Sequence, residues 1–393
     1  MRGHVVIAPD KFKGTLTAAE AAGHIAAGLR RVRPGLAHTL LPVADGGDGT
    51  VEAAVAAGFS QVKAVVTGPA GEPVVASYAV RGTTAVIELA EASGLRRLPG
   101  GRPAPLTATS RGTGELVDAA LAGGARRIVL GLGGSACTDG GAGMAAALGV
   151  RFLDAAGAEL PPGGAALRRL VSIDVAGLPA RLADVEVVVA SDVDSPLLGR
   201  DGAAEVFAPQ KGASPTQVRA LELGLTRLAS VIALAAADGA APDSRAPDPR
   251  AAGAAVARAA GAGAAGGVGF GAMVFLGATV RPGIGYLLDL LGFAEAVRGA
   301  RLVVTGEGSL DPQSLRGKAP VGVAEAAARE GVATVAVAGR RALTGEQLRK
   351  AGLRDAFALT DIEPDPLRCM AEAGPLLERL TAERVAPAWL PDA

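Results

Sequence analysis

Short apolar runs rich in β-branched residues alternate with alanine-rich stretches at both ends of the chain, and this alternation constrains the fold more than any other feature. The runs expected to form strands are 4–9 and 37–44 near the N-terminus and 301–306, 332–339 and 356–360 near the C-terminus. Helices are expected from Thr17, which forms a capping box with Glu20, from Thr50, and around 319–330 and 344–351. Apolar strands separated by helices of this length predict parallel sheets covered on both faces.

The middle of the chain follows a different pattern. Two apolar runs flank the turn-forming cluster 69–73, which predicts an antiparallel hairpin. Further strands are expected at 84–90, 126–132 and 185–193, and an exposed loop is expected at 238–250, where Pro and Asp are frequent. The sheet of this middle region is therefore predicted to be mixed, and the chain to contain two α/β regions.

Composition excludes several classes of protein. The 393 residues include 39 Lys and Arg and 39 Asp and Glu, a balance that argues against a broad surface for nucleic acid or an acidic membrane. Cys137 and Cys369 are too few for a disulfide framework and lack zinc-ligand spacing, which favours a cytoplasmic location. The uncharged stretch 259–280 is long enough to span a bilayer, but seven of its residues are Gly, so a buried loop and helix are expected instead.

Polar sequence follows five of the expected strands, at 8–14, 44–49, 131–141, 191–195 and 305–311. Ligands of open α/β sheets bind beyond the carboxyl ends of the strands. A helix cap would account for any one of these segments, but all five together favour a binding cleft. Phosphoryl transfer suits their composition, because carboxylates hold Mg²⁺ and glycine-lined backbone can approach phosphate. Asp45 and Asp48 are the first candidates for the metal or its water ligands.

Simpler motifs fail or compete. A P-loop needs Gly at the position of Pro312 and Ser or Thr at the position of Ala319. Ser135 lacks the late histidine of a Ser-His-Asp hydrolase. The main rival is a dinucleotide fold, because 131–136 matches G-x-G-x-x-A after a strand and Asp154 lies roughly 20 residues further on. This alternative leaves the other four polar strand ends unexplained.

The chain closely resembles the bacterial glycerate kinase family, the two-domain type that phosphorylates D-glycerate with ATP. The matching stretches run in the family's order from residue 7 to residue 324 and include "IAPDKFKGTLTAAEAA", "PVADGGDGTVEA", "IELAEASGL", "RGTGELV", "GLGGSACTDGGAGM", "ASDVDSPLLG", "FAPQKGA", "GAAGGVG", "RPGI" and "VVTGEGSLDPQSLRGKAPVGVA". Departures are modest, such as Asp48 where Glu is common in the family. The resemblance implies cytoplasmic phosphorylation of glycerate with Mg²⁺ and ATP, with 2-phosphoglycerate the favoured product.

The resemblance also implies a fold of two α/β domains. Residues 1–66 plus 290–393 are expected to form one domain around a parallel, Rossmann-like sheet. Residues 67–289 are expected to form an inserted domain with a mixed sheet. The active site is expected in the cleft between them, and the oligomeric state is left open.

Roles are assigned to the polar residues on this basis. Asp45, Asp48 and Glu307 are expected to bind Mg²⁺ or its waters, although helix capping is the competing explanation. Asp192 is the expected proton acceptor for the substrate hydroxyl, with Asp194 as the alternative, because residues two apart in an extended chain point to the same side. Lys13 is expected to act on the transferred phosphate.

The remaining assignments concern binding. The nucleotide phosphates are expected to contact Gly133, Gly134, Ser135, Asp139, Gly306 and Lys318. Glycerate is expected to contact Asp10, Lys211 and Arg281, and a guanidinium can grip its carboxylate in bidentate fashion. Solvated lysines and simple turn residues are the competing explanations. A non-catalytic ligand-binding protein on the same scaffold is the second class of function retained.

Overall fold

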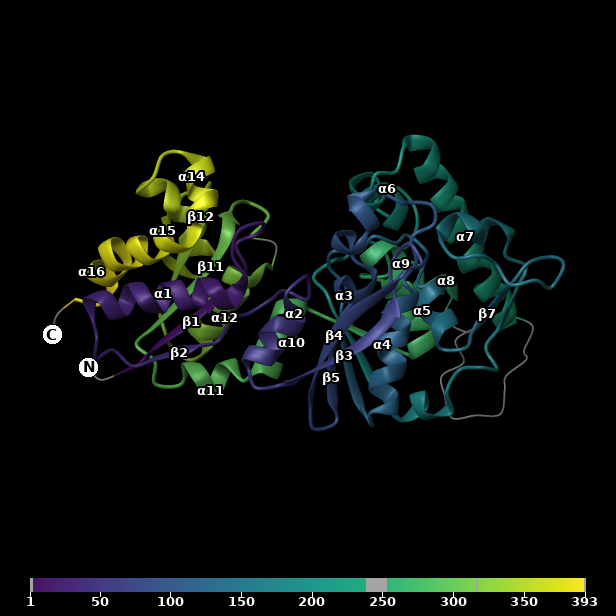
Figure 1. Cartoon of the computed structure of the whole chain (residues 1–393), viewed down its shortest axis with the longest axis horizontal. Helices are drawn as coiled ribbons and strands as arrows, with labels where there is room; N and C mark the ends of the chain where they lie inside the picture. Colours follow the sequence, from purple (N-terminus) through teal and green to yellow (C-terminus); the bar gives the residue numbers. More distant parts are fainter. Residues whose placement is uncertain (1–2, 238–252, 316, 392–393) are drawn as a thin grey trace. The chain divides into compact units, whose positions relative to one another are not determined.

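The computed structural model describes residues 3–237, 253–315 and 317–391, and the chain forms two compact units (Figure 1). The terminal unit consists of Met1–Asp45, Glu52–Phe59 and Pro282–Ala393, and the inserted unit of Gly46–Val51 and Ser60–Arg281. The loop predicted at 238–250 lies outside the described residues. The short segment Gly46–Val51 belongs to the inserted unit although both of its neighbours in sequence belong to the terminal unit.

The terminal unit contains a parallel five-stranded sheet in the order β13-β12-β11-β1-β2. Its strands are β1 (Val5–Pro9), β2 (His38–Leu40), β11 (Leu302–Leu310), β12 (Thr334–Arg341) and β13 (Leu353–Ala358). The N-terminal strand β1, purple in Figure 1, lies beside the green strand β11 near the other end of the chain. The predicted fold class, with a parallel sheet shared by the two ends of the chain, is confirmed.

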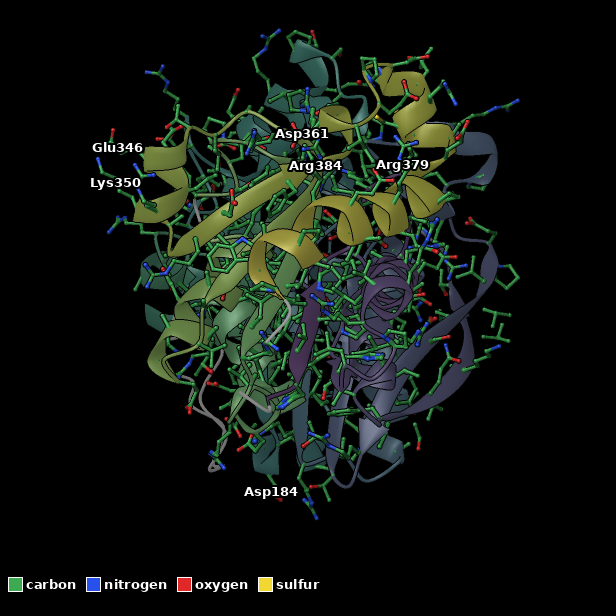
Figure 2. All side chains as sticks on the ribbon, turned by 90° about the vertical axis from the view of Figure 1, so that its left-hand side faces the viewer. Asp184, Glu346, Lys350, Asp361, Arg379 and Arg384 are labelled. Carbon is green, nitrogen blue, oxygen red and sulfur yellow. The ribbon has the colours of Figure 1, made fainter. Side chains whose placement is uncertain are left out.

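Helices cover both faces of this sheet because its central strands are apolar on both sides. In β12, Val335 and Val337 pack in the core beneath α1 (Ala18–Val32) and α15 (Ala373–Leu380), whereas Ala336 and Ala338 face α12 (Ala319–Arg329) and α13 (Gly345–Lys350). The capping box predicted for Thr17 and Glu20 opens α1. On the surface of α13, Glu346 and Lys350 pair at 2.8 Å across one turn (Figure 2).

The other helices of the terminal unit are α10 (Gly283–Leu291), α11 (Phe293–Val297), α14 (Pro366–Ala371) and α16 (Ala386–Trp389). Helix α2 (Thr50–Ala56) begins within the segment that belongs to the inserted unit. Strand β2 ends at Leu40, earlier than the predicted 44, and Pro42 offers no N–H to extend the ladder. The chain nevertheless stays aligned, since Val43 N donates to Pro9 O at 3.0 Å.

The inserted unit contains a six-stranded mixed sheet in the order β10-β9-β6-β5-β4-β3. Its strands are β3 (Ser60–Thr67), β4 (Pro73–Arg81), β5 (Thr84–Glu88), β6 (Arg127–Gly131), β9 (Glu186–Ala190) and β10 (Thr279–Arg281). Strands β3 and β4 form the predicted antiparallel hairpin, and β5, β6, β9 and β10 are parallel to one another. The sequence division placed most of β3 in the terminal domain, but its ladder joins it to β4.

The helices of the inserted unit are α3 (Leu89–Ser93), α4 (Arg111–Ala122), α5 (Ala142–Ala147), α6 (Ala203–Phe207), α7 (Pro215–Ala237), α8 (Gly253–Val256) and α9 (Ala264–Leu276). The uncharged stretch 259–280 forms the buried helix α9 and strand β10. Within the described ranges, no helix is both long and apolar enough to cross a membrane.

The dinucleotide alternative does not match this topology. Strand β7 (Arg151–Leu153), which precedes Asp154, pairs with β8 (Ser172–Asp174) in a separate antiparallel sheet and does not lie beside β6. Asp154 accepts hydrogen bonds from the amides of Ala156 and Ala158 in an exposed turn. It therefore shapes a hairpin and does not follow a second strand of a dinucleotide-binding unit.

Candidate functional site

Three carboxylates gather at the carboxyl edge of the parallel sheet in the terminal unit. Asp10 follows β1, and its amide donates to Gly306 O in β11 at 2.8 Å. Glu307, the next residue of β11, is buried. Burial and the charge of Asp45 raise the pKa of Asp10 to about 8. Burial also raises the pKa of Glu307, with a smaller contribution from Asp45. The fold of the terminal unit therefore brings Asp10, Asp45 and Glu307 close enough for their charges to interact.

Two predicted lysines belong to the same unit. Lys318 occupies the position just before α12, and its Nζ lies 3.9 Å from Oε2 of Glu307. Lys13 lies in an exposed turn after β1. The backbone of this turn approaches β11 closely, since a Cβ on Gly308 would lie 3.1 Å from Lys13 N. Gly306 has a packing reason of its own, because a Cβ there would lie 2.4 Å from Val337 O.

The carboxylates of the terminal unit can be compared with what a cation site needs. Oε1 of Glu307 is buried and accepts no hydrogen bond from the described residues. No group of three His, Cys, Asp or Glu side chains in the described ranges forms a ready metal cage. Mg²⁺ commonly uses only one or two carboxylates, together with water and substrate phosphate. Asp45 and Glu307 therefore fit Mg²⁺ as a pair of oxygen ligands.

In the inserted unit, the candidate residues follow one row across four parallel strands. Glu88 pairs with Gly131, Gly131 with Ala190, and Ala190 with Arg281, each at or near the carboxyl end of its strand. Asp192 and Asp194 come directly after β9 and are exposed, as is Arg281. The amide of Ser191 donates to Arg281 O at 3.1 Å, so the two strand ends stay together. Register thus places the segment that carries the candidate base next to the strand end that carries the candidate carboxylate clamp.

A glycine-rich turn follows β6 at the same edge. Gly134 has a positive φ of 72°, a conformation that glycine adopts without strain. The amide of Gly133 is already used, since it donates to Gly46 O at 3.3 Å. Among the described residues, the amides of Gly134 and Ser135 have no acceptor. These two amides are the donors that the turn can offer to an anion.

Lys211 lies beneath this turn and is buried, with 3% of its surface exposed. Its Nζ donates to Ser135 Oγ at 2.8 Å and to Cys137 O at 2.5 Å. Burial lowers its pKa to about 8, an effect that Cys137 and Asp139 partly oppose. A Cβ on Gly266 would lie 2.9 Å from Nζ, so a larger residue there would crowd the amine. The predicted substrate ligand is therefore a buried support of the turn.

Asp139 is also buried, but its carboxylate is saturated with donors. It accepts hydrogen bonds from Ser110 N at 2.8 Å, Ser110 Oγ at 2.9 Å, Gly141 N at 3.1 Å and Gly143 N at 3.3 Å. Burial raises its pKa, and these bonds act in the opposite direction. The predicted phosphate residue thus ties the start of α4 to the start of α5.

Asp48 has neighbours that the sequence interpretation missed. Its carboxylate pairs with Arg96, which also contacts Glu88 and Glu91. Glu88 is buried, with 1% exposed, and burial raises its pKa to about 7. One indication of this role is present in the sequence, because Glu88 is the only charged residue in the expected strand 84–90.

Parallel strands that end in acids, glycines and lysines are typical of α/β enzymes that bind ligands at this edge of the sheet. A sequence model of the glycerate kinase family matches residues 5–390. The glycerate kinase of Bacillus subtilis (strain 168) is 44% identical over 358 residues, which cover 90% of each chain. The glycerate 2-kinase of Escherichia coli (strain K12) is 44% identical over 338 residues, covering 85% of this chain and 84% of the relative.

A solved structure from Salmonella typhimurium LT2, of a protein assigned as glycerate kinase 2, superposes with a TM-score of 0.82 at 40% identity. The match covers 99% of this chain and 98% of the other. The chain belongs to the glycerate kinase family and is an enzyme of the kinase class.

Proposed function

We propose that this enzyme transfers the γ-phosphoryl group of ATP to D-glycerate, with 2-phosphoglycerate as the product and ADP as the leaving group. The identity to proteins named glycerate kinase over most of the chain carries this proposal. The name of the Escherichia coli relative, glycerate 2-kinase, favours the 2-hydroxyl as the acceptor. The groups that each unit gathers at its sheet edge are those that phosphoryl transfer requires.

In this proposal the terminal unit handles metal and phosphate. Asp45 and Glu307 would hold Mg²⁺, which when bound neutralises charge on the transferred phosphoryl group. Asp10 would contact glycerate. Lys13 and Lys318 would contact phosphate oxygens, with the backbone at Gly306 shaping the approach.

The inserted unit would bind glycerate and take up the proton. Asp192, with Asp194 as the alternative, accepts the proton of the substrate hydroxyl. The hydroxyl oxygen then bonds to the γ-phosphorus as the bond to the β,γ-bridging oxygen breaks. Arg281 pairs with the glycerate carboxylate. The amides of Gly134 and Ser135 contact phosphate, and Lys211 places its charge under that turn. Gly133 and Asp139 hold the turn in shape, and Asp48 supports the metal.

The test is ADP release from MgATP with D-glycerate, measured beside the Asp192→Asn variant as a control for contaminating ATPase. Enolase added to the product distinguishes the two isomers, because it consumes 2-phosphoglycerate directly. Glycerate-dependent ADP release with an enolase-competent product supports the proposal. Absence of ADP release, or NADH formation from NAD and glycerate without ATP, overturns it.

A further inference from the structure

The segment Gly46–Val51 is seated directly on the strand ends of the inserted unit. A Cβ on Gly46 would lie 2.2 Å from Ala190 O, and a Cβ on Gly133 would lie 2.3 Å from Gly47 Cα. Real side chains do not tolerate such distances, so only glycine fits at this contact. The segment carries Asp48, and Asp45 immediately precedes it. The placement of this glycine-rich loop therefore decides where a predicted metal residue lies.

Glu88 holds this segment from the end of β5. Its Oε2 accepts hydrogen bonds from the amides of Gly49 at 3.0 Å and Val51 at 3.3 Å. Gly49 directly precedes α2 and Val51 is its second residue. The N–H groups at the start of a helix lack partners inside the helix. A buried carboxylate is costly unless donors compensate it, and the loop supplies two of the donors that Glu88 needs. Glu88 and the segment therefore satisfy each other.

A second connection reaches the side chain of Asp48. Arg96 donates through NH2 to Oε1 of Glu88 at 3.3 Å and pairs through NH1 with Asp48. The same guanidinium contacts Glu91 at 2.7 Å. Glu88 thus holds the backbone of the loop directly and its carboxylate through Arg96. Glu91 contacts Arg96 and Arg97 and accepts a hydrogen bond from the amide of Ser77.

We propose that Glu88 is a positioning residue that fixes the loop 46–51 and, with Arg96, aims Asp48 at the reacting groups. The proposal builds on the proposed function, in which Asp48 supports the metal. Residues that orient a metal-binding group commonly matter about 10- to 100-fold in affinity or activity, and the effect expected here is at the low end of that range. Glu91 provides a matched control, since it is a carboxylate on the same arginine and its backbone partner is the amide of Ser77 in β4.

The experiment compares Glu88→Ala, Glu88→Gln and Glu91→Gln in the full-length enzyme. Hydrogen exchange of peptides covering 46–51 is measured first, without Mg²⁺ or substrate. We expect faster exchange in both Glu88 variants, with Glu88→Gln intermediate because its uncharged amide oxygen still accepts hydrogen bonds but more weakly than a carboxylate oxygen. Glu91→Gln should exchange as the wild type does. Glu88→Gln keeps the test valid if Glu88→Ala does not fold.

The Mg²⁺ concentration for half-maximal turnover is measured on the same variants. We expect it to rise by up to about 10-fold for Glu88→Ala, as for loss of the Asp48 charge, and not for Glu91→Gln. Unchanged exchange in 46–51 for a folded Glu88 variant, or equal effects from Glu88→Gln and Glu91→Gln, overturns the proposal. If exchange rises while Asp48→Asn leaves the Mg²⁺ requirement normal, the loop assignment stands and the metal role of Asp48 fails.

Discussion

Buried charge is compensated differently in the two units. Asp139 in the inserted unit accepts hydrogen bonds from two amides at the start of α5 and from both donors of Ser110. Lys211 beside it donates to two oxygens. In the terminal unit, Asp10 and Glu307 lie near Asp45, and Oε1 of Glu307 accepts no hydrogen bond from the described residues. Asp139 and Lys211 are thus satisfied by their surroundings, whereas Asp10, Asp45 and Glu307 repel one another, and a bound cation could relieve that repulsion.

The difference separates residues that maintain the fold from residues that await a partner. A carboxylate surrounded by donors stabilises its loop, and its removal disrupts that loop. Carboxylates that repel one another lower the stability of the free protein, and this is the usual compromise at a functional site. The predictions below are ordered from the largest expected effect to the smallest.

Asp192→Asn should have the largest effect, because it removes the proposed proton acceptor. Loss of a general base lowers turnover by about 10²–10⁴-fold, while nucleotide affinity should change little. Steady-state turnover and nucleotide binding by titration calorimetry check this. If the variant keeps more than about a tenth of wild-type turnover, Asp192 is not the base and Asp194→Asn is the next variant to measure.

Lys211 should give stability and nucleotide binding opposite pH dependences. Its pKa of about 8 in the folded protein lies below the ordinary lysine value of 10.5, so the unfolded chain binds more protons between these two pH values. The titration of Lys211 should therefore make the free energy of unfolding rise between about pH 8 and 10.5, by up to about 3 kcal/mol. Loss of the charge over the same range should weaken phosphate binding.

The comparison uses Lys211→Met, which removes the titrating amine near Cys137 and Asp139. Denaturant unfolding at several pH values should show a smaller alkaline rise in stability for this variant than for the wild type. Parallel slopes in the two proteins would show that Lys211 keeps an ordinary pKa.

Removing one carboxylate from each unit should change stability in opposite directions. Asp139→Asn should lower the free energy of unfolding by about 1.5–3 kcal/mol, the range for hydrogen bonds to a charged group. Asp45→Asn should raise the free energy of unfolding of the metal-free protein by about 0.5–2 kcal/mol, because it relieves repulsion with Asp10 and Glu307. Urea unfolding without Mg²⁺ measures both. Destabilisation by both substitutions would remove the contrast between the units.

The smallest effect is expected at Asp48, where one substitution removes the carboxylate and another keeps it. Asp48→Asn should raise the Mg²⁺ requirement by about 10-fold, within the range for groups that support a metal. Asp48→Glu should stay close to the wild type, because it keeps a carboxylate that can meet Arg96. Turnover as a function of Mg²⁺ concentration distinguishes them. A normal Mg²⁺ requirement in Asp48→Asn would reduce Asp48 to a loop residue.

Local sequence patterns predicted the elements well. The capping box at Thr17 opens a helix, the cluster 69–73 turns a hairpin, and both strand series form the expected kinds of sheet. The β7–β8 pair and the early end of β2 were missed, since short strands depend on pairing partners that lie elsewhere in the chain. The polar residues at strand ends could also be predicted, because each group directly follows its own strand in the sequence.

The sequence by itself determined the α/β class, the parallel and mixed sheets, and the family to which the chain belongs. Tertiary structure decided which charges meet. Strand register sets Glu88, Gly131, Ala190 and Arg281 in one row, and the fold brings Lys211 to Ser135 and Cys137. It also left Asp139 saturated and Glu307 with a buried oxygen that accepts no hydrogen bond from the described residues. These outcomes depend on packing between distant segments, because burial and neighbouring donors fix the charge state of a group and no local pattern records them.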